Sequence, residues 1–175
     1  MLVNNARISS APGSRFRSPV DEIAENIRAV YETNVFGVVR VTNAFMPLLR
    51  ESEASRIVNL TSKRGSIGEE GAWVGRPYMS YSTSKTALNA ITVHYARSLE
   101  GTSIKVNSAA PGHVATDFNG FTGKRTPEEG AAGSTVGSTG QRWTDRNGLR
   151  RRSPTLMVIF PLSGADASRM ALVVH

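Results

Sequence analysis

Residues 78–90 read Tyr-Met-Ser-Tyr-Ser-Thr-Ser-Lys-Thr-Ala-Leu-Asn-Ala and begin a pattern with helical spacing. Tyr81 lies four residues before Lys85, so a helix places the phenol and the ammonium on one face. A free tyrosine is a poor acid at neutral pH, because its pKa is about 10. A fixed cation nearby favours the phenolate, so the pair predicts a Tyr81 with a lowered pKa that exchanges a proton near neutrality.

The apolar spacing on either side of this stretch predicts alternating helices and strands. Apolar residues recur every three or four positions over Val20–Glu51 and again over Ser80–Glu100, which indicates two amphipathic helices. Short apolar runs at 1–6, Ile57–Leu60 and Ile104–Ala109 indicate buried strands. Helices that alternate with short buried strands imply a parallel sheet with right-handed crossovers.

The bulk composition limits the class of protein. The chain has 175 residues, 39% hydrophobic and 20% charged, which suits one soluble globular domain with a core. Its longest apolar runs fall short of the roughly 20 residues of a membrane span, and the N-terminus has no signal-peptide pattern. The absence of cysteine excludes disulfides, zinc–thiolate sites and cysteine nucleophiles, and we expect no metal and a cytoplasmic location.

The net charge of +7 raises the question of nucleic-acid binding. Residues 131–175 contain six arginines and two aspartates, a net charge of +4, so the first 130 residues carry only +3. The basic excess therefore lies in a tail that has no nucleic-acid motif. We interpret Arg150-Arg151-Arg152 as a solvated run and expect neither nucleic acid nor a membrane as a partner.

Further motifs accompany Tyr81 and Lys85, in an order that is characteristic of one enzyme family. They are Leu-Val-Asn-Asn-Ala at 2–6, Glu-Thr-Asn-Val-Phe-Gly at 32–37, Arg-Ile-Val-Asn-Leu-Thr-Ser at 56–62, Ile-Lys-Val-Asn at 104–107 and Pro-Gly-His-Val-Ala-Thr-Asp at 111–117. With them the chain resembles the classical short-chain dehydrogenase/reductase family, in particular its carbonyl-reductase-like members. The resemblance covers about residues 1–130.

The resemblance implies an α/β fold, a partial Rossmann-like doubly wound parallel sheet in three α/β/α layers. It implies an NAD(P)-dependent oxidoreductase that moves a hydride between a nicotinamide and a ketone, an aldehyde or an alcohol. In that reaction Tyr81 is the acid or base, and Lys85 lowers its pKa and holds the nicotinamide ribose. Ser62 donates a hydrogen bond to the substrate oxygen. Asn34 anchors a water that links Lys85 to solvent.

Other interpretations of these four residues stay open from the sequence alone. Tyr81 could be a half-buried aromatic residue whose hydroxyl bonds a backbone group. Thr61 competes with Ser62 for the place at the end of the strand. Asn34 could lie on a helix surface and face solvent.

The resemblance also implies a set of cofactor contacts, with NADP(H) expected in preference to NAD(H). Besides Tyr81 and Lys85 the set contains Asn5, Ala6, Pro111, Gly112, Val114 and Thr116. Arg7 stands where the family has glycine, and its bulk puts the neighbouring contact in doubt. The family's variable substrate lid corresponds to Asp117–Arg125. Candidate pocket walls are Phe118, Phe121, His113 and Trp73, whereas His94 is expected to be structural.

Both ends of the chain depart from the family pattern. The glycine-rich fingerprint that binds the cofactor pyrophosphate is not found in the sequence, so we expect the N-terminal βα units to be missing. Thr126 and Glu129 predict the start of a helix, but the sequence beyond Gly130 does not continue a helical pattern. The predicted organisation is therefore a catalytic part at 1–130 and a tail at 131–175, which either diverges or arises from a change of reading frame.

Two functions follow from this pattern. One is a short-chain oxidoreductase acting on a small carbonyl or alcohol substrate, assembled as a homo-oligomer through its two long helices. The alternative is a truncated, inactive remnant that serves at most as an oligomerisation or interaction module.

Overall fold

The computed structural model describes residues 1–14, 17–68 and 75–131. Its centre is a sheet of three parallel strands in the order β1-β2-β3, formed by Leu2–Asn4, Arg56–Leu60 and Lys105–Ala109. Val58 of β2 lies opposite Val3 on one side and Asn107 on the other. The parallel sheet predicted from the sequence is confirmed.

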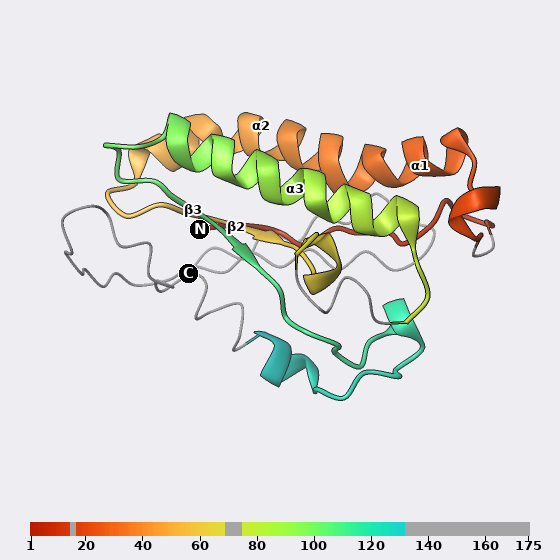
Figure 1. Ribbon diagram of the computed structural model, residues 1–175. Coiled ribbons are helices and arrows are strands. Elements are labelled where there is room, and N and C mark those ends of the chain that lie inside the picture. The colour runs from red at the N-terminus through yellow and green to blue at the C-terminus, as the bar shows by residue number, and fades with distance from the viewer. Residues whose placement is uncertain (15–16, 69–74, 132–175) are drawn as a thin grey trace.

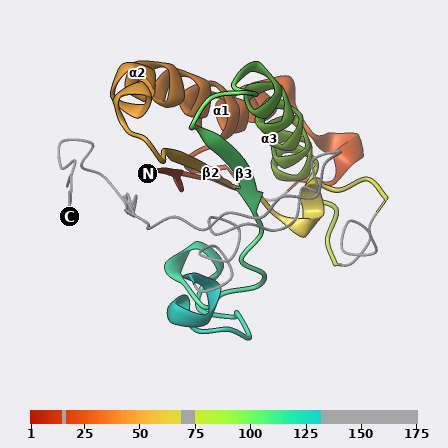
Figure 2. The ribbon, with the colours of Figure 1, turned by 90° about the vertical axis from the view of Figure 1, so that its left-hand side faces the viewer.

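One layer of helices covers a single face of this sheet (Figures 1 and 2). Helix α1 (Ala24–Tyr31), the π-helix η2 (Glu32–Gly37) and helix α2 (Val38–Glu51) follow one another along the chain without a break. Helix α3 (Met79–Ser98) lies beside them. Both predicted helices are therefore present, and the second matches its predicted bounds to within two residues.

The first predicted helix begins later than expected, at Ala24 rather than Val20. Residues Pro19–Asp21 form a separate 3₁₀ turn, η1. Glu22 and Ile23 after it are extended, and the Glu22 carboxylate accepts hydrogen bonds from Asn26 Nδ2 and from Ser80 Oγ of α3. The side chain of Glu22 thus ties the helix start to α3, and this tertiary contact competes with a longer helix.

The core lies on both faces of the sheet, because successive side chains of a strand point to opposite sides. Toward the helices the buried cluster consists of Leu2, Leu49, Ile57, Leu99, Ile104 and Val106. On the other face it consists of Val3, Val58, Leu60 and Ala109. Burial of one such aliphatic side chain contributes roughly 1.5–3 kcal/mol to folding.

A buried polar network crosses from the sheet to the helices. Asn4 Nδ2 donates to Asn59 Oδ1 at 2.8 Å and to Thr42 Oγ1 at 3.1 Å. Asn59 Nδ2 donates to Thr92 Oγ1 at 2.9 Å. Because buried amides without partners are destabilising, these bonds fix β1 and β2 against α2 and α3.

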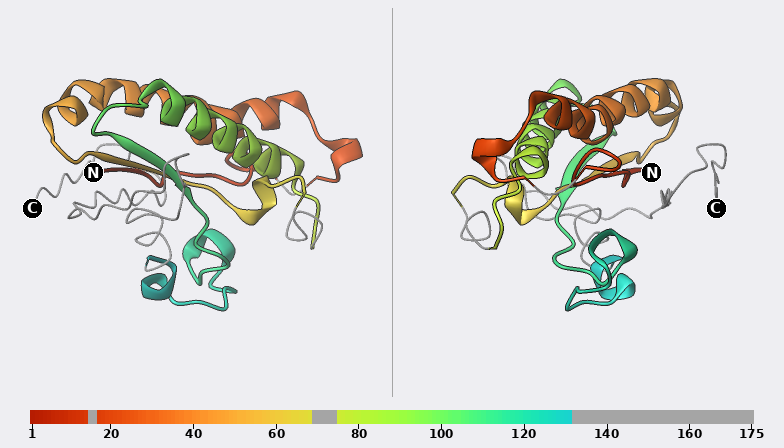
Figure 3. Two further views of the ribbon diagram at one scale, coloured as in Figure 1. Left: turned by 60° about the vertical axis from the view of Figure 1, so that its left-hand side comes forward. Right: turned by 90° about the vertical axis from the view of Figure 1, so that its right-hand side faces the viewer.

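The chain after β3 turns to the side of the sheet away from the helices (Figures 1 and 3). It contains the 3₁₀ turn η5 (Asp117–Asn119) and a bridge between Val114 and Arg125. Thr126 then begins a helical turn at 127–131: its backbone N–H donates to Glu129 Oε2, and Glu129 N–H donates to Thr126 Oγ1. This confirms the predicted helix start.

Some sequence predictions fall outside the described residues. Those on Trp73 and on residues 132–175, including the origin of the tail, belong to this group. Among the helices in the described part, none is both long enough and apolar enough to cross a bilayer.

Candidate active site

Lys85 is the most deeply buried charged residue of the described chain, with 1% of its surface exposed. Its Nζ donates to the backbone oxygen of Leu60 at 2.7 Å, at the carboxyl end of β2, and lies 5.8 Å from the centre of the Tyr81 ring. Burial, helped by the charge of Arg7, lowers the pKa of Lys85 to about 7. Helix α3 therefore holds an amine that changes its charge near neutral pH.

Gly65 makes room for the backbone of Lys85. Gly65 ends the 3₁₀ turn η3 (Lys63–Gly65), which packs against α3. A Cβ at Gly65 would lie 2.8 Å from the Lys85 carbonyl carbon and 2.9 Å from its Cβ. A glycine is required at this position because of the close approach.

Tyr81 does not have the lowered pKa that the sequence predicted. Burial raises its pKa above the ordinary value, and the opposing effects are the charges of Arg7 and Arg64 and a hydrogen bond with Ser62. Lys85 is not among these opposing groups, since its Nζ bonds Leu60 and is itself partly neutral at pH 7. In this structure Tyr81 is thus a protonated phenol at neutral pH, suited to donate a proton.

The structure distinguishes between Ser62 and Thr61, the two hydroxyl residues that compete for the place beside Tyr81. The Ser62 hydroxyl is close enough to Tyr81 to lower its pKa, and its Oγ accepts from the Arg64 backbone N–H at 3.2 Å. Thr61 Oγ1 instead donates to Asn89 Oδ1 at 2.6 Å. Of the two hydroxyls, the one that meets Tyr81 is that of Ser62.

Asn34 lies in the π-helix η2 and is fully buried, which rules out the solvent-facing interpretation. Its Oδ1 accepts from Ile8 N–H at 2.9 Å, and its Nδ2 donates to Ile8 O at 2.9 Å and to Ser84 Oγ at 3.0 Å. These direct bonds go to the loop after β1 and to the residue before Lys85, and none goes to Lys85 itself. Asn34 therefore positions both segments.

Arg7 is a site residue that the sequence analysis treated only as an obstacle. It is half-buried, and its Cζ lies 4.3 Å from the centre of the Phe118 ring. The Phe118 ring in turn lies 5.9 Å from the Tyr81 ring, tilted by 46°. The signal for Arg7 was its position just beyond the carboxyl end of β1, where ligands bind on parallel sheets.

Asn5 and Ala6 directly follow β1, and the loop after β3 holds Pro111, Gly112, Val114 and Thr116. Gly112 has φ +84°, a left-handed conformation that favours glycine, and Pro111 O accepts from Arg125 Nη1 at 3.3 Å. Thr116 directly precedes η5, and its backbone N–H donates to Asn119 Oδ1 at 3.3 Å. Even so, within the described residues its Oγ1 is the one buried side-chain polar atom without a well-formed hydrogen bond.

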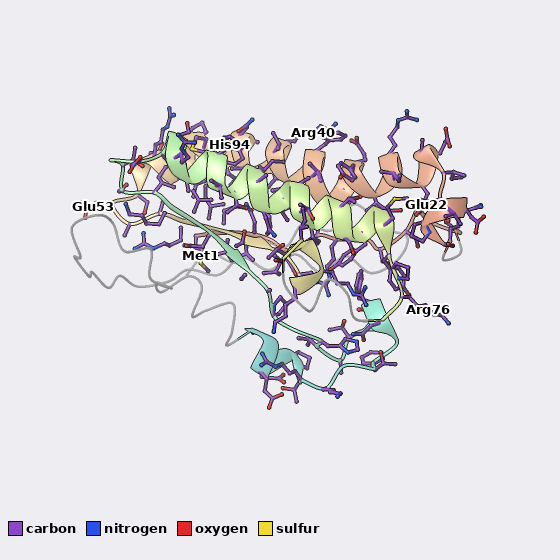
Figure 4. All side chains as sticks on the ribbon, viewed as in Figure 1. Met1, Glu22, Arg40, Glu53, Arg76 and His94 are labelled. Atoms are coloured by element: carbon purple, nitrogen blue, oxygen red, sulfur yellow. The ribbon has the colours of Figure 1, made fainter. Side chains whose placement is uncertain are left out.

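A small polar cavity of about 180 Å³ lies at the start of α3, near the labelled Glu22 in Figure 4. Its walls include Ser9, Arg17, Tyr78 and Ser80. Tyr81, Ser62, Lys85 and Asn34 are not among its lining residues. His113 and His94 are both exposed, and Phe121 is largely exposed with φ 59°.

Residues 1–126 match the family model described as short chain dehydrogenase. The chain belongs to the short-chain dehydrogenase family. One relative is the short-chain dehydrogenase anuI of Penicillium roqueforti (strain FM164), 43% identical over 140 residues that cover 75% of this chain and 53% of that protein. Another is a 3-oxoacyl-[acyl-carrier-protein] reductase of Synechocystis sp., 32% identical over 118 residues, 67% of this chain and 43% of that protein.

Solved structures of the same family share the fold. The NADPH-bound carbonyl reductase from chicken fatty liver has a TM-score of 0.67 and 28% identity, covering 78% of this chain and 57% of that one. The carbonyl reductase Sniffer of D. melanogaster has a TM-score of 0.66 and 29% identity, with the same coverage. This short-chain dehydrogenase chain thus spans about half the length of the curated relatives that it matches.

Proposed function

We propose that this chain carries the catalytic part of an NAD(P)-dependent oxidoreductase that interconverts a ketone or aldehyde with an alcohol. The observation that carries this proposal is the group of Tyr81, Ser62 and Lys85 at the carboxyl end of β2, in which Tyr81 and Lys85 are buried and Ser62 is half-buried. A hydroxyl, a phenol and an amine together can hold a carbonyl oxygen and transfer a proton to it.

The residues divide the proton chemistry among them. The nicotinamide, when bound, supplies or accepts the hydride. Tyr81 donates a proton to the substrate oxygen during reduction and takes it back during oxidation. Ser62, whose hydroxyl lies near the phenol, donates a hydrogen bond to that oxygen as negative charge develops on it. Asn34 positions Ser84 beside Lys85, and a water on Asn34 would connect the amine to solvent.

Several groups fit a dinucleotide cofactor. Lys85 Nζ has three donors and bonds one described acceptor, Leu60 O, so two donors suit the hydroxyls of the nicotinamide ribose. The buried Thr116 Oγ1 suits the nicotinamide amide. Asn5, Ala6, Pro111, Gly112 and Val114 are the other proposed contacts. The NADPH-bound carbonyl reductase among the structural neighbours supports NADP(H) over NAD(H).

The outer helix surface supports self-association. Leu48 of α2 and Val93 of α3 are large apolar residues with 60% and 45% of their surface exposed. We propose that copies of the chain pair through these two helices. The alternative function, an inactive interaction module, would retain this pairing without turnover.

The test is NADPH binding to the 175-residue chain by calorimetry, followed by reduction of a panel of aldehydes and ketones. We expect Lys85→Ala to weaken NADPH binding and Tyr81→Phe to reduce turnover by about a thousandfold while NADPH still binds. Tyr95→Phe, on the same helix but bonded to Asn43, is the matched control and should keep its activity. Turnover that survives Tyr81→Phe would refute the assigned chemistry. A folded chain that binds no NADPH would favour the inactive module.

A further inference from the structure

Arg7 has an unusual set of contacts for an arginine beside an active site. The face of its guanidinium rests on Phe118, with Cζ 4.3 Å from the ring centre. Its other described contact is a long hydrogen bond, from Nη1 to Asn5 Oδ1 at 3.3 Å. Within residues 1–14, 17–68 and 75–131, no carboxylate pairs with it.

The surroundings of Tyr81 are positively charged. The charges that influence its phenol are those of Arg7 and Arg64, and Arg7 also influences Lys85. No acidic residue is among the groups that act on either side chain. Arg7 is half-buried and no described carboxylate pairs with it, so its position favours an anionic ligand.

The stacking geometry leaves the guanidinium able to bind such a ligand. A guanidinium has five N–H donors in its plane, and an aromatic ring on its face uses none of them. The donors at the edge of the guanidinium can make a two-point contact with a carboxylate. Phe118 supports the guanidinium, and its ring centre also lies 5.9 Å from that of Tyr81.

We propose that Arg7 is a specificity-determining residue that selects carbonyl substrates carrying a carboxylate. This inference rests on the proposed function, since it assumes that the carbonyl is reduced at Tyr81. Arg7 Cζ and the Tyr81 ring lie 4.3 and 5.9 Å from the centre of the same Phe118 ring, so one small molecule can place its oxygen at the phenol and its carboxylate at Arg7. A cofactor phosphate is the other source of an anion, and the experiment separates the two.

The first arm measures binding, not turnover. Benzoate and its neutral analogue benzamide are titrated into the full chain at low salt, with and without NADP⁺. We expect benzoate to bind about tenfold more tightly or better, as a charge-assisted hydrogen bond provides. Arg7→Gln should abolish the preference and Arg7→Lys should reduce it, because lysine keeps the charge but loses the planar fork.

The matched control is Arg40→Gln. Arg40 lies on the side of the helix layer away from the sheet, where it pairs with Glu32 (Figure 4). The control removes one positive charge as Arg7→Gln does, and it should keep the full preference for benzoate. Circular dichroism checks that each variant is folded.

Three outcomes overturn the proposal. Benzoate binds no better than benzamide or does not bind; the preference survives Arg7→Gln; or Arg7→Gln weakens NADP⁺ binding and leaves benzoate unaffected. The third outcome assigns Arg7 to a cofactor phosphate.

The second arm compares the reduction of terephthalaldehydic acid with that of its methyl ester. We expect kcat/KM to favour the acid in the wild-type chain, and Arg7→Gln to remove that preference. If the acid and the ester are reduced equally well, the proposed oxidoreductase activity is supported and the proposed role of Arg7 is refuted. If neither is reduced while benzoate binding depends on Arg7, the anion site stands and the proposed reaction fails.

Discussion

Replacing Lys85 by methionine should stabilise the protein at neutral pH, although it removes a proposed catalytic residue. Lys85 is buried, and burial lowers its pKa from 10.5 to about 7. In the unfolded chain the amine is free to hold its proton up to its ordinary pKa. Folding at neutral pH therefore requires the amine either to lose its proton or to remain charged in the interior.

The magnitude follows from the two pKa values. With a folded pKa of about 7 and an ordinary value of 10.5, the buried amine destabilises the wild type at about pH 7.5 by about 4 kcal/mol. Methionine removes this effect and loses the hydrogen bond to Leu60 O, which contributes about 1 kcal/mol. We expect Lys85→Met to be more stable by about 3 kcal/mol at that pH.

The pH dependence is the sharper measurement. A lowered folded pKa means that the unfolded state binds more protons between pH 7 and 10.5, so the stability of the wild type rises with pH in this window. From about pH 7.5 to about pH 9.5 the wild type should gain about 2 to 3 kcal/mol relative to Lys85→Met. Below pH 7 the difference between the two should level off, since Lys85 is then charged in both states.

Urea unfolding followed by far-ultraviolet circular dichroism measures this difference. Lys105→Met is the control, because Lys105 is an exposed lysine on β3. The free energy of unfolding of Lys105→Met should differ from that of the wild type by a constant amount over the same pH window. A constant offset for Lys85→Met would show that Lys85 keeps its proton in the folded state, and the reasoning from burial would be wrong.

Three more predictions concern the neighbours of Lys85. Gly65→Ala should destabilise the protein by about 2 kcal/mol in urea unfolding, because its Cβ would meet the Lys85 backbone, whereas Gly68→Ala has open space and should change little. Asn34→Ala should lower the unfolding free energy by about 3 kcal/mol, since it leaves Ile8 N–H and O without their partner; Asn43→Ala, at an exposed position, should have a much smaller effect. The rate of alcohol oxidation should keep rising with pH through about pH 9, because burial raises the pKa of Tyr81 and oxidation needs the phenolate; a plateau below about pH 8 would contradict this.

The sequence was sufficient for the strands, the two long helices and the meeting of Tyr81 with Lys85. Each depends on local periodicity, and the four-residue interval puts both side chains on one face of α3 whatever surrounds them. The predicted direction of the Tyr81 pKa shift was wrong, because the shift depends on burial and on Arg7 and Arg64, which lie outside α3. The stack of Arg7 on Phe118 joins residues far apart in the chain and leaves no periodic signal.

The sequence does contain a pattern that indicates the π-helix, but several residues of this pattern are polar. Buried side chains follow one another at four-residue steps through Asn26, Val30, Asn34, Val38 and Thr42. In an α-helix each such step passes a full turn by about 40°, so the row would drift away from the sheet. The wider turn at η2 offsets this drift. Three of the five residues are polar, so a search for apolar spacing did not find the row.

Because η2 is a wide turn, deleting one of its residues should affect the fold and the active site differently. Removing one residue, such as Thr33, would let η2 close into an ordinary α-helical turn, with α1 still packed against α3 and α2 against the sheet. Asn34 would then leave its place between Ile8 and Ser84. Such a deletion should leave a folded protein with an impaired site, which unfolding and turnover measurements on the same variant can separate. A protein of this kind can therefore lose its chemistry through one codon without losing its shape.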